Sequence, residues 1–374
     1  MKKNIPVSIP FLDKTETSYV NDAMQKGAIS GYFGDYLPRF EKLFSSYCGT
    51  KHGVSVSNGT TAIHLALVAV GIKQGDEVLV STLTNMATFF AVLYQGAKPV
   101  PIDIEPDTLN IDPSLLESKI TPRTKAILVV HLFGHPVDMD PVNKVAKKHG
   151  LVVIEDCAEA HGALYKGKKT GSLGKAGCFS FYANKIITTG EGGMVTTDDG
   201  ALAEKMRSLK SLAFGDEFKF MHKDIGYNYR LPNLQAAIGC AQIEKIEKII
   251  GKKRSIAAYY AKRLKSVSEI QLPVEKPYAR SVYWMYHIVL KGKTAKQRQV
   301  IMKKLKSKGI ETREGFIPYN LQKIFIERGL TQKKECPVAN SVAYNSFYLP
   351  TGPVLSEEEM DYVTANLKDA LVQR

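Results

Sequence analysis

The sequence predicts an α/β protein, with a large and mostly parallel sheet in a first domain and a smaller α/β domain at the C-terminus. Across residues 54–157, short runs of β-branched residues alternate with helix-like stretches. Strand, helix and strand in this order are typical of a parallel sheet covered by helices on both faces. The 374 residues exceed what one compact domain usually holds. We therefore divide the chain into residues 1–245 and 246–374, with the N-terminal segment free to pack on the smaller domain.

Four apolar runs account for the predicted strands of the first domain. Each is short and rich in valine, isoleucine or leucine, as expected for strands buried on both faces. They are residues 77–82, 98–104, 125–134 and 151–157. Between them, residues 85–96 and 139–150 are predicted as helices that end at glycine. Residues 57–71 are predicted as a further helix, because apolar residues there recur on one helix face.

A long helical pattern over residues 231–267 begins the second part of the chain and is expected to bridge the two domains. A strand is predicted at 283–292, a helix at 295–309 and a last helix at 356–372. This series is typical of a smaller α/β domain.

Charge and cysteine content limit the class of protein. The formal net charge is +14, but the lysine-rich runs at 251–255 and 301–309 fall on polar faces of predicted helices, so we expect a small anionic partner and no nucleic acid. The five cysteines are scattered without a CxxC pair, which argues against a disulfide framework and a metal site. No apolar run approaches twenty residues, so we expect no membrane association and a cytoplasmic protein.

Three features fall where a parallel sheet gathers its ligands, beyond the carboxyl ends of the strands. Asp156 closes an apolar strand, and a helix N-cap or a core salt bridge is its structural alternative. The turn at 57–61 begins a helix, where free amides bind anions, although ordinary capping uses the same residue types. Lys185 stands between two strand-like stretches, and it is either a surface lysine or a buried nucleophile.

Together the three features match the needs of pyridoxal phosphate. This cofactor needs a lysine that forms an imine, an acid that faces its pyridinium nitrogen and an anion-binding turn for its phosphate. Lys185, Asp156 and the 57–61 turn supply these groups in plausible order. Their coincidence favours a functional role for Lys185 over that of an ordinary surface lysine.

Four stretches carry a resemblance to a known family, namely residues 57–67, 153–174, 179–199 and 226–243. Over essentially its whole length the chain resembles the fold-type I sugar aminotransferases of the DegT/DnrJ/EryC1/StrS type, which depend on pyridoxal 5′-phosphate. The resemblance implies an aspartate aminotransferase-like fold. It also implies a homodimer in which the two subunits share their active sites.

The resemblance assigns roles residue by residue. Lys185 would form the imine with the cofactor and then move protons, and Asp156 would keep the pyridinium nitrogen protonated. Glu159 would lie beside the phenolic oxygen of the cofactor, where many members have glutamine. The other cofactor-binding positions are Gly59, Thr60, Thr61, Asn85 and Ser180, with Asn228 reaching the phosphate from the neighbouring subunit.

Two positions depart from the family pattern on the substrate side. Asn85 replaces an aromatic residue that stacks on the cofactor ring in many members, and Asn320 replaces a histidine near the substrate. Arg230 and Arg313 are candidates to bind the donor carboxylate or the pyrophosphate of the sugar, with structural ion pairs as the alternative. His161 completes the predicted substrate-binding set.

The resemblance implies transfer of an amino group from L-glutamate to a nucleotide-linked keto sugar for surface polysaccharide. Residues 155–162 and 184–194 are most similar to members that convert GDP-4-keto-6-deoxymannose to GDP-perosamine. The alternative within enzymes is an aminotransferase for a UDP- or dTDP-linked keto sugar or a small phosphorylated ketone. The alternative of another class is a regulator that binds the cofactor without catalysis.

Overall fold

The computed structural model describes residues 4–372 and contains a seven-stranded mixed sheet. Its strands, in spatial order, are β1 (His52–Val56), β9 (Gly193–Thr197), β8 (Ala176–Ser180), β5 (Val152–Asp156), β4 (Thr124–Val130), β2 (Glu77–Ser81) and β3 (Lys98–Ile102). β9 runs antiparallel to both of its neighbours, and the other strands are mutually parallel. The predicted fold class, α/β with a mostly parallel sheet, is confirmed.

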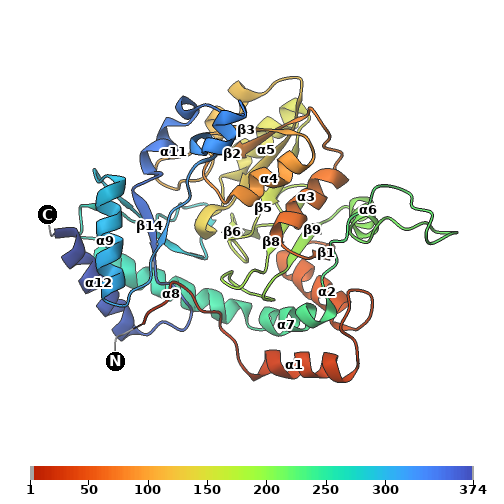
Figure 1. Cartoon of the computed structure of the whole chain (residues 1–374), viewed down its shortest axis with the longest axis horizontal. Coiled ribbons are helices and arrows are strands. Elements are labelled where there is room, and N and C mark those ends of the chain that lie inside the picture. Colours follow the sequence, from red (N-terminus) through yellow and green to blue (C-terminus); the bar gives the residue numbers. More distant parts are fainter. Residues whose placement is uncertain (1–3, 373–374) are drawn as a thin grey trace.

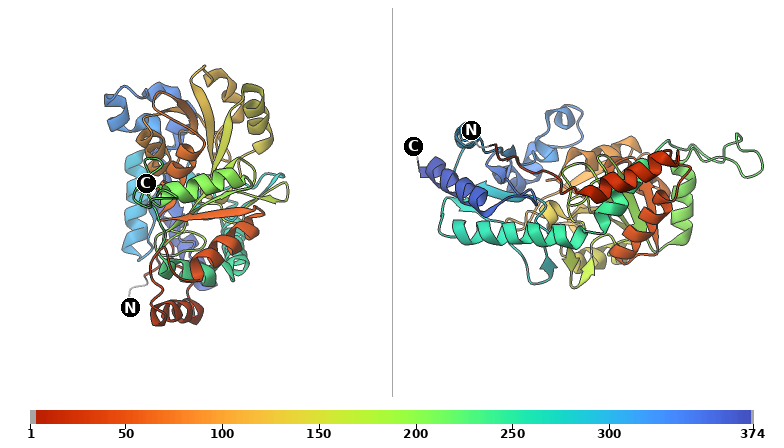
Figure 2. Two further views of the ribbon diagram at one scale, coloured as in Figure 1. Left: turned by 90° about the vertical axis from the view of Figure 1, so that its right-hand side faces the viewer. Right: turned by 90° about the horizontal axis from the view of Figure 1, so that it is seen from below.

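Helices cover both faces of this sheet. On one face, α3 (Gly59–Ala69), α4 (Met86–Tyr94) and α6 (Gly200–Lys210) contribute to one apolar core. On the other face lie α2 (Tyr36–Cys48), α5 (Met139–His149) and α7 (Asn233–Ile243). In the left view of Figure 2, strand β1 lies between α6 and α2. The first helix, α1 (Lys14–Gln25), packs outside this layer against α7.

The long helical pattern predicted at 231–267 is interrupted, which corrects the sequence prediction. The structure has α7 followed by a separate α8 (Ile246–Leu264). Lys245 between them has φ −119° and ψ 10°, outside the helical region. Its amine pairs with Asp13 at 2.7 Å and Glu16 at 2.8 Å at the start of α1. The break therefore coincides with a long-range ion pair that no local periodicity encodes.

A second, antiparallel sheet has the order β10 (Ile270–Gln271), β12 (Tyr286–Leu290), β14 (Ser346–Leu349) and β13 (Arg313–Glu314). It shares an apolar core with α8, α9 (Ala295–Ser307) and α12 (Glu357–Val372). Figure 1 shows this group at the left, with α8 and α7 running along the lower side of the molecule. The N-terminal segment joins it, since Ile5 pairs with Ile310 and Val7 accepts a hydrogen bond from Thr351.

Short elements complete the chain. A small sheet of β11 (Ala279–Arg280), β6 (Leu164–Tyr165) and β7 (Lys168–Lys169) ties the segment before β12 to the loop after β5. The remaining short elements are α10 (Lys323–Glu327), α11 (Pro337–Val342), and the 3-10 turns η1 (Pro113–Leu115), η2 (Glu117–Lys119), η3 (Leu132–Gly134), η4 (Tyr319–Leu321) and η5 (Lys333–Glu335). None of the helices in residues 4–372 has the length and apolar character needed to cross a membrane. The division at residues 245 and 246 stays a prediction.

Candidate active site

The carboxyl ends of the parallel strands open into a cavity of about 880 Å³. Ser57 follows β1, Val130 ends β4, Asp156 ends β5 and Ser180 ends β8, and all four line the cavity. Register explains this convergence, because Val130 pairs with Asp156, and Asp156 pairs with Cys178 two residues before Ser180. The cavity therefore lies where open α/β sheets place their ligands.

Lys185 enters the cavity from the turn between β8 and β9. Its backbone N–H donates to Tyr182 O at 2.9 Å, and Gly190, with φ +81°, turns the chain back toward β9. Burial lowers the pKa of the Lys185 amine, and the nearby carboxylates of Glu159 and Asp156 partly offset that effect. A lysine with a depressed pKa is a better nucleophile and proton acceptor near neutral pH.

Two hydrogen bonds hold the Asp156 carboxylate in place, and its oxygens can accept further hydrogen bonds. Its Oδ2 accepts from the Thr88 hydroxyl at 2.8 Å, and its Oδ1 accepts from Ala158 N–H at 3.1 Å. Burial raises the pKa of the carboxyl, while these two bonds and the charge of Lys185 act in the opposite direction. A cation bound next to a buried carboxylate of this kind stabilises its ionised form.

Glu159 is a second buried acid on the wall of the cavity, with 3% of its surface exposed. Burial raises the pKa of this carboxyl to about 7, against the opposing charge of Lys185. Its Oε2 accepts from the backbone N–H of Phe133 at 2.7 Å. Phe133 has φ +54°, a left-handed conformation that is uncommon for a bulky residue, so this contact holds a strained turn next to the site.

The start of α3 offers backbone donors to an anion. Asn58 caps the helix by accepting from Thr61 N–H at 2.9 Å, and the Thr61 hydroxyl donates back to Asn58 O at 2.8 Å. Within residues 4–372, the amides of Gly59 and Thr60 have no hydrogen-bond acceptor, and both residues line the cavity. A Cβ on Gly59 would lie 2.7 Å from the Ser180 Cβ, so glycine permits the close approach of these two walls.

Most of the residues predicted for the cofactor line this one cavity. They are Gly59, Thr60, Thr61, Asn85, Asp156, Glu159, Ser180 and Lys185, and Arg313 of the predicted substrate set joins them. The Thr61 hydroxyl is engaged in the capping box, so its contact with a ligand is limited. Asn85 caps α4 by accepting from Ala87 N–H at 2.9 Å. The aromatic residue expected at that position is thus replaced by a helix cap.

Two residues predicted to contact the substrate, His161 and Asn320, do not line this cavity. His161 is fully buried between aromatic rings of the core, with its ring centroid 5.3 Å from Phe179 and 5.6 Å from Phe181. Asn320 is also fully buried, accepting from the Thr82 hydroxyl and donating to Lys333 O. The substrate contacts predicted for both residues stay predictions.

Asn228 and Arg230 lie outside the cavity of their own chain. Asn228 is exposed, and its backbone forms a bridge to Ser211. The guanidinium of Arg230 packs over the ring of Tyr32 at 4.7 Å. Neither residue contacts the cavity that holds Lys185.

Residues of the second sheet and its flanking segments, which sequence reasoning did not identify, complete the cavity. They are Trp284, Met285, Glu314, Phe316 and Tyr348. Trp284 is the only tryptophan of the chain. Its position at the start of a predicted strand was the one sequence feature that could have marked any of these residues as part of the site. The cavity thus lies between the large sheet and the second sheet.

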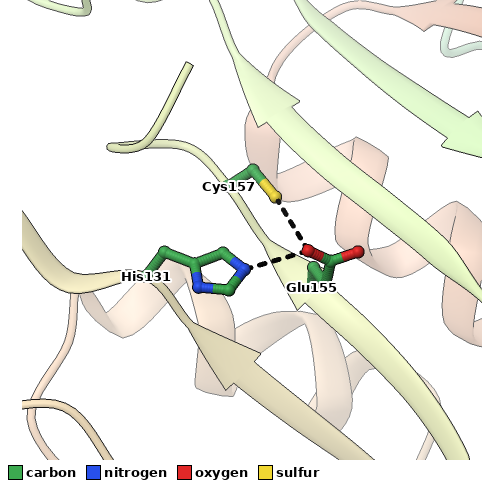
Figure 3. A group of neighbouring side chains, drawn as sticks. All are labelled: His131, Glu155 and Cys157. Carbon is green, nitrogen blue, oxygen red and sulfur yellow. Dashed lines mark hydrogen bonds and ion pairs between the residues drawn. The ribbon is translucent and has the colours of Figure 1, made fainter. Parts of the chain in front are cut away.

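A buried cluster behind the cavity, His131, Glu155 and Cys157, has the composition of a metal site (Figure 3). His131 Nδ1 accepts from Val137 N–H at 3.0 Å, so Nε2 carries the proton and donates to Glu155 Oε2 at 3.0 Å. Three amides of the loop at 171–174 also donate to the two Glu155 oxygens at 2.7 to 2.8 Å. The lone pairs that a metal would need are occupied, so the cluster is structural.

Comparison with known proteins agrees with this geometry. The chain is 43% identical to the GDP-perosamine synthase of Caulobacter vibrioides over 372 residues, which cover 98% of each chain. It is 38% identical to the dTDP-3-amino-3,6-dideoxy-alpha-D-galactopyranose transaminase of Aneurinibacillus thermoaerophilus over 364 residues, covering 95% of this chain and 97% of the other.

A solved structure, the putative sugar aminotransferase Spr1654 from Streptococcus pneumoniae in its PMP-form, superposes with a TM-score of 0.94. It is 27% identical and covers 99% of this chain and 98% of its own. The fold and site define an aminotransferase that depends on pyridoxal 5′-phosphate. Residues 10–368 match the DegT/DnrJ/EryC1/StrS aminotransferase family, and the chain belongs to it.

The residues present fit this cofactor. The free amides of Gly59 and Thr60, next to the Ser180 hydroxyl, can hold a phosphate at the positive end of α3. Asp156 can face a protonated ring nitrogen, and Lys185, which lines the same cavity, can reach a carbonyl. The small side chain of Ala158, which also lines the cavity, leaves room for a flat ring.

Proposed function

We propose that this protein transfers an amino group from L-glutamate to a nucleotide-linked keto sugar, converting GDP-4-keto-6-deoxymannose to GDP-perosamine. Such a product is a building block of surface polysaccharide. The placement of Lys185 in one cavity with Asp156 and the free amides of α3 carries the aminotransferase part of the proposal. The similarity to a GDP-perosamine synthase, at 43% identity over 98% of the chain, supports the choice of sugar.

Lys185 is the central residue of the proposed chemistry. When bound, pyridoxal phosphate supplies an electron sink that lets a proton leave the carbon bearing the amino group. Lys185 Nζ would hold the cofactor covalently, would be released when the amino group of the donor takes its place, and as a free amine would then move the proton from the carbon bearing the amino group to the adjacent carbon of the cofactor. Burial lowers the pKa of this amine and so favours its neutral form, in which it can accept a proton.

The two buried acids have separate roles in this proposal. Asp156 faces the ring nitrogen and stabilises its protonated form, because the carboxylate is desolvated and no cation of residues 4–372 is in hydrogen-bond contact with it. Glu159, which lines the same cavity, would lie beside the phenolic oxygen of the bound cofactor. Since its pKa is about 7, it donates a hydrogen bond in the protonated form and repels the phenolic oxygen when ionised.

The phosphate and the nucleotide are assigned to the two ends of the cavity. Gly59 N–H, Thr60 N–H and the Ser180 hydroxyl bind the phosphate of the cofactor. Arg313, half of whose side chain is exposed, is available for the donor carboxylate or the sugar pyrophosphate. The volume of about 880 Å³ is toward the upper end of the roughly 300–1,000 Å³ typical of small-molecule sites, which leaves room for a large second ligand.

We further propose a homodimer in which Asn228 of each chain reaches the phosphate site of its partner. The segment before Asn228 projects from the body of the molecule after α6 (Figure 1). Its large apolar side chains are exposed, with Phe218 at 66%, Phe220 at 80% and Ile225 at 82%. Exposed apolar surface of this kind is typical of an interaction site, and a second copy of the chain would cover it.

The substrate assignment is tested by a panel of keto sugars on GDP, UDP and dTDP, each supplied with L-glutamate and followed by product mass. We expect the GDP-linked 4-keto-6-deoxy hexose to be aminated with the highest kcat/KM. The similarity to a dTDP-sugar transaminase makes a dTDP-linked keto sugar the second candidate. Turnover of that sugar without any turnover of a GDP-linked ketone would contradict the proposal.

The same preparation separates catalysis from a purely regulatory function. Addition of glutamate alone to the holoenzyme shifts the visible absorbance of the cofactor if the first half of the transamination takes place. An unchanged spectrum, with the cofactor demonstrably bound, would favour a regulator.

A further inference from the structure

Trp284 is the residue through which the second sheet reaches the catalytic lysine. It lies just before β12, is the only tryptophan in the chain and has 4% of its surface exposed. Its side chain lines the cavity that also holds Lys185. No role for it follows from the sequence alone.

Both parts of the indole contact the turn that carries Lys185. The Lys185 Nζ lies 4.0 Å from the centroid of the indole, within the range of a cation–π interaction. The indole Nε1–H donates to the backbone oxygen of Asn184, the preceding residue, at 2.7 Å. The Trp284 side chain therefore fixes the backbone just before Lys185 and also contacts the amine at the end of the lysine side chain.

The backbone of Trp284 is itself fixed on two sides. Its N–H donates to Phe133 O at 3.0 Å in the turn after β4. Its carbonyl accepts from the amine of Lys253 at 2.8 Å, on the long helix α8. Lys253 is 1% exposed, so this bond lies in the interior. The indole is thus anchored between elements that are distant in sequence, as a precise contact with Lys185 requires.

We propose that Trp284 is the positioning residue of Lys185, keeping the amine over the indole face and aimed into the cavity and partly offsetting the loss of its charge by burial. The inference rests on the proposed role of Lys185 as the residue that holds and moves the proton. Burial disfavours the charged amine, and the quadrupole of the indole opposes this effect where water is excluded. The indole and the acids of the cavity thus set the protonation of Lys185 together.

Other charged and titratable groups also act on this amine. Glu159 and Asp156 favour its charged form, Lys253 donates to the Trp284 carbonyl, and the buried His161 interacts electrostatically with the amine. The remaining titratable groups that line the cavity are Tyr94, Tyr182, Glu191, Arg313, Glu314 and Tyr348. A test must therefore change the ring of Trp284 and leave these groups in place.

The test compares Trp284→Phe with Trp284→Met in the full chain after removal of the cofactor. Cyanate carbamylates only the neutral amine, so its rate at Lys185 against pH, read by peptide mass, gives the lysine pKa. We expect the pKa to fall from the native chain to the Phe variant and further to the Met variant. The Met variant should react roughly 2- to 30-fold faster than the native chain below the pKa, the factor expected for losing a cation–π contact.

Phe316→Leu is the matched control, because Phe316 is an aromatic residue of the same cavity wall without a cation–π contact to Lys185 among residues 4–372. It should leave the carbamylation profile unchanged. Equal profiles for the native chain and for the Phe and Met variants would overturn the proposal.

A second readout needs no change at Trp284. Since this is the only tryptophan, its fluorescence reports on this site alone. We expect the emission of the native chain to change with pH at the midpoint found by carbamylation, and this step to vanish in Lys185→Met. A step that persists unchanged in Lys185→Met would overturn the proposal. Neither measurement uses a sugar substrate, so failure here is distinct from failure of the proposed function.

Discussion

Glu155 and Asp156 are consecutive buried acids at the end of β5, and they differ in how fully their oxygens are bonded. Their side chains point to opposite faces of the sheet, as strand geometry requires. Glu155 accepts from His131 and from three amides of the loop at 171–174. Asp156 accepts two hydrogen bonds and faces the cavity.

This difference separates a structural acid, Glu155, from Asp156, the acid for which we propose a function. An acid whose lone pairs are satisfied within the protein stabilises the fold and has nothing left for a ligand. Asp156, Glu159 and Lys185 share a cavity and have shifted pKa values, a combination that is concentrated at functional sites. The cluster around Glu155 has the residue types of a metal site and lacks the free lone pairs.

Among substitutions in the cavity, Lys185→Ala is expected to reduce activity most. The change removes both the covalent attachment of the cofactor and the proton carrier, so amine transfer should fall by about 10⁴-fold or more. Product formation from a keto sugar measures it. Lys175→Ala is the matched control, because Lys175 is a half-exposed lysine of the same region, paired with Asp199 at 2.6 Å, and should leave the rate unchanged.

The same variant tests the shared site. Mixed dimers of Lys185→Ala and Asn228→Ala chains contain one intact site if Asn228 acts across the interface. Activity that returns on mixing supports the dimer, and a mixture as inactive as its components contradicts it.

On the structural side, Glu155→Ala should lower the free energy of unfolding by about 3–5 kcal/mol, because it leaves the buried His131 and three backbone amides without their acceptor. Urea unfolding measures the loss. Glu117→Ala removes an exposed glutamate that also pairs with a histidine, His149, at 2.9 Å, and should cost less than about 1 kcal/mol. Similar losses of unfolding free energy for Glu155→Ala and Glu117→Ala would contradict the structural role of the buried cluster around Glu155.

The smallest expected effect is a pH dependence caused by Glu159. The folded protein holds a proton on Glu159 up to a pKa of about 7, whereas the unfolded chain releases it near 4.5. Unfolding free energy therefore falls as pH rises through this window, by roughly 3 kcal/mol for this group alone.

Glu159→Gln should remove that part of the slope in the cofactor-free protein, since glutamine does not titrate. The difference between native and variant curves isolates Glu159 from Asp156, whose pKa is shifted in the same direction. Parallel stability curves for the two proteins between pH 4.5 and 7 would contradict a protonated Glu159.

Local sequence patterns were sufficient for much of the fold. The runs predicted at 77–82 and 151–157 became β2 and β5, and the helix predicted at 295–309 became α9. These elements follow from side-chain period and from turn residues, both of which are local. Helices α1, α2 and α6 and strand β14 were not predicted.

For the site, the sequence identified residues at strand ends and in the first turn of a helix that line one cavity. Lys185, Asp156 and Gly59 lie in short motifs whose spacing reflects their chemistry, and the structure brings them to one cavity. The sequence did not show that His161 and Asn320 would be buried outside this cavity, because their burial depends on the packing of rings and loops from other parts of the chain. Motif position alone does not show which way a side chain points.

The sequence by itself determined the fold class and identified the lysine and the acid at the end of β5. Side-chain periodicity and short motifs are properties of consecutive residues. Only the tertiary structure decided that the Glu155 oxygens are fully hydrogen-bonded while Asp156 faces the cavity. It also decided that Trp284 contacts a turn 100 residues away in the sequence. The physical reason is that hydrogen-bond saturation and ring contacts depend on atoms brought together by folding. Neither leaves a local pattern in the chain.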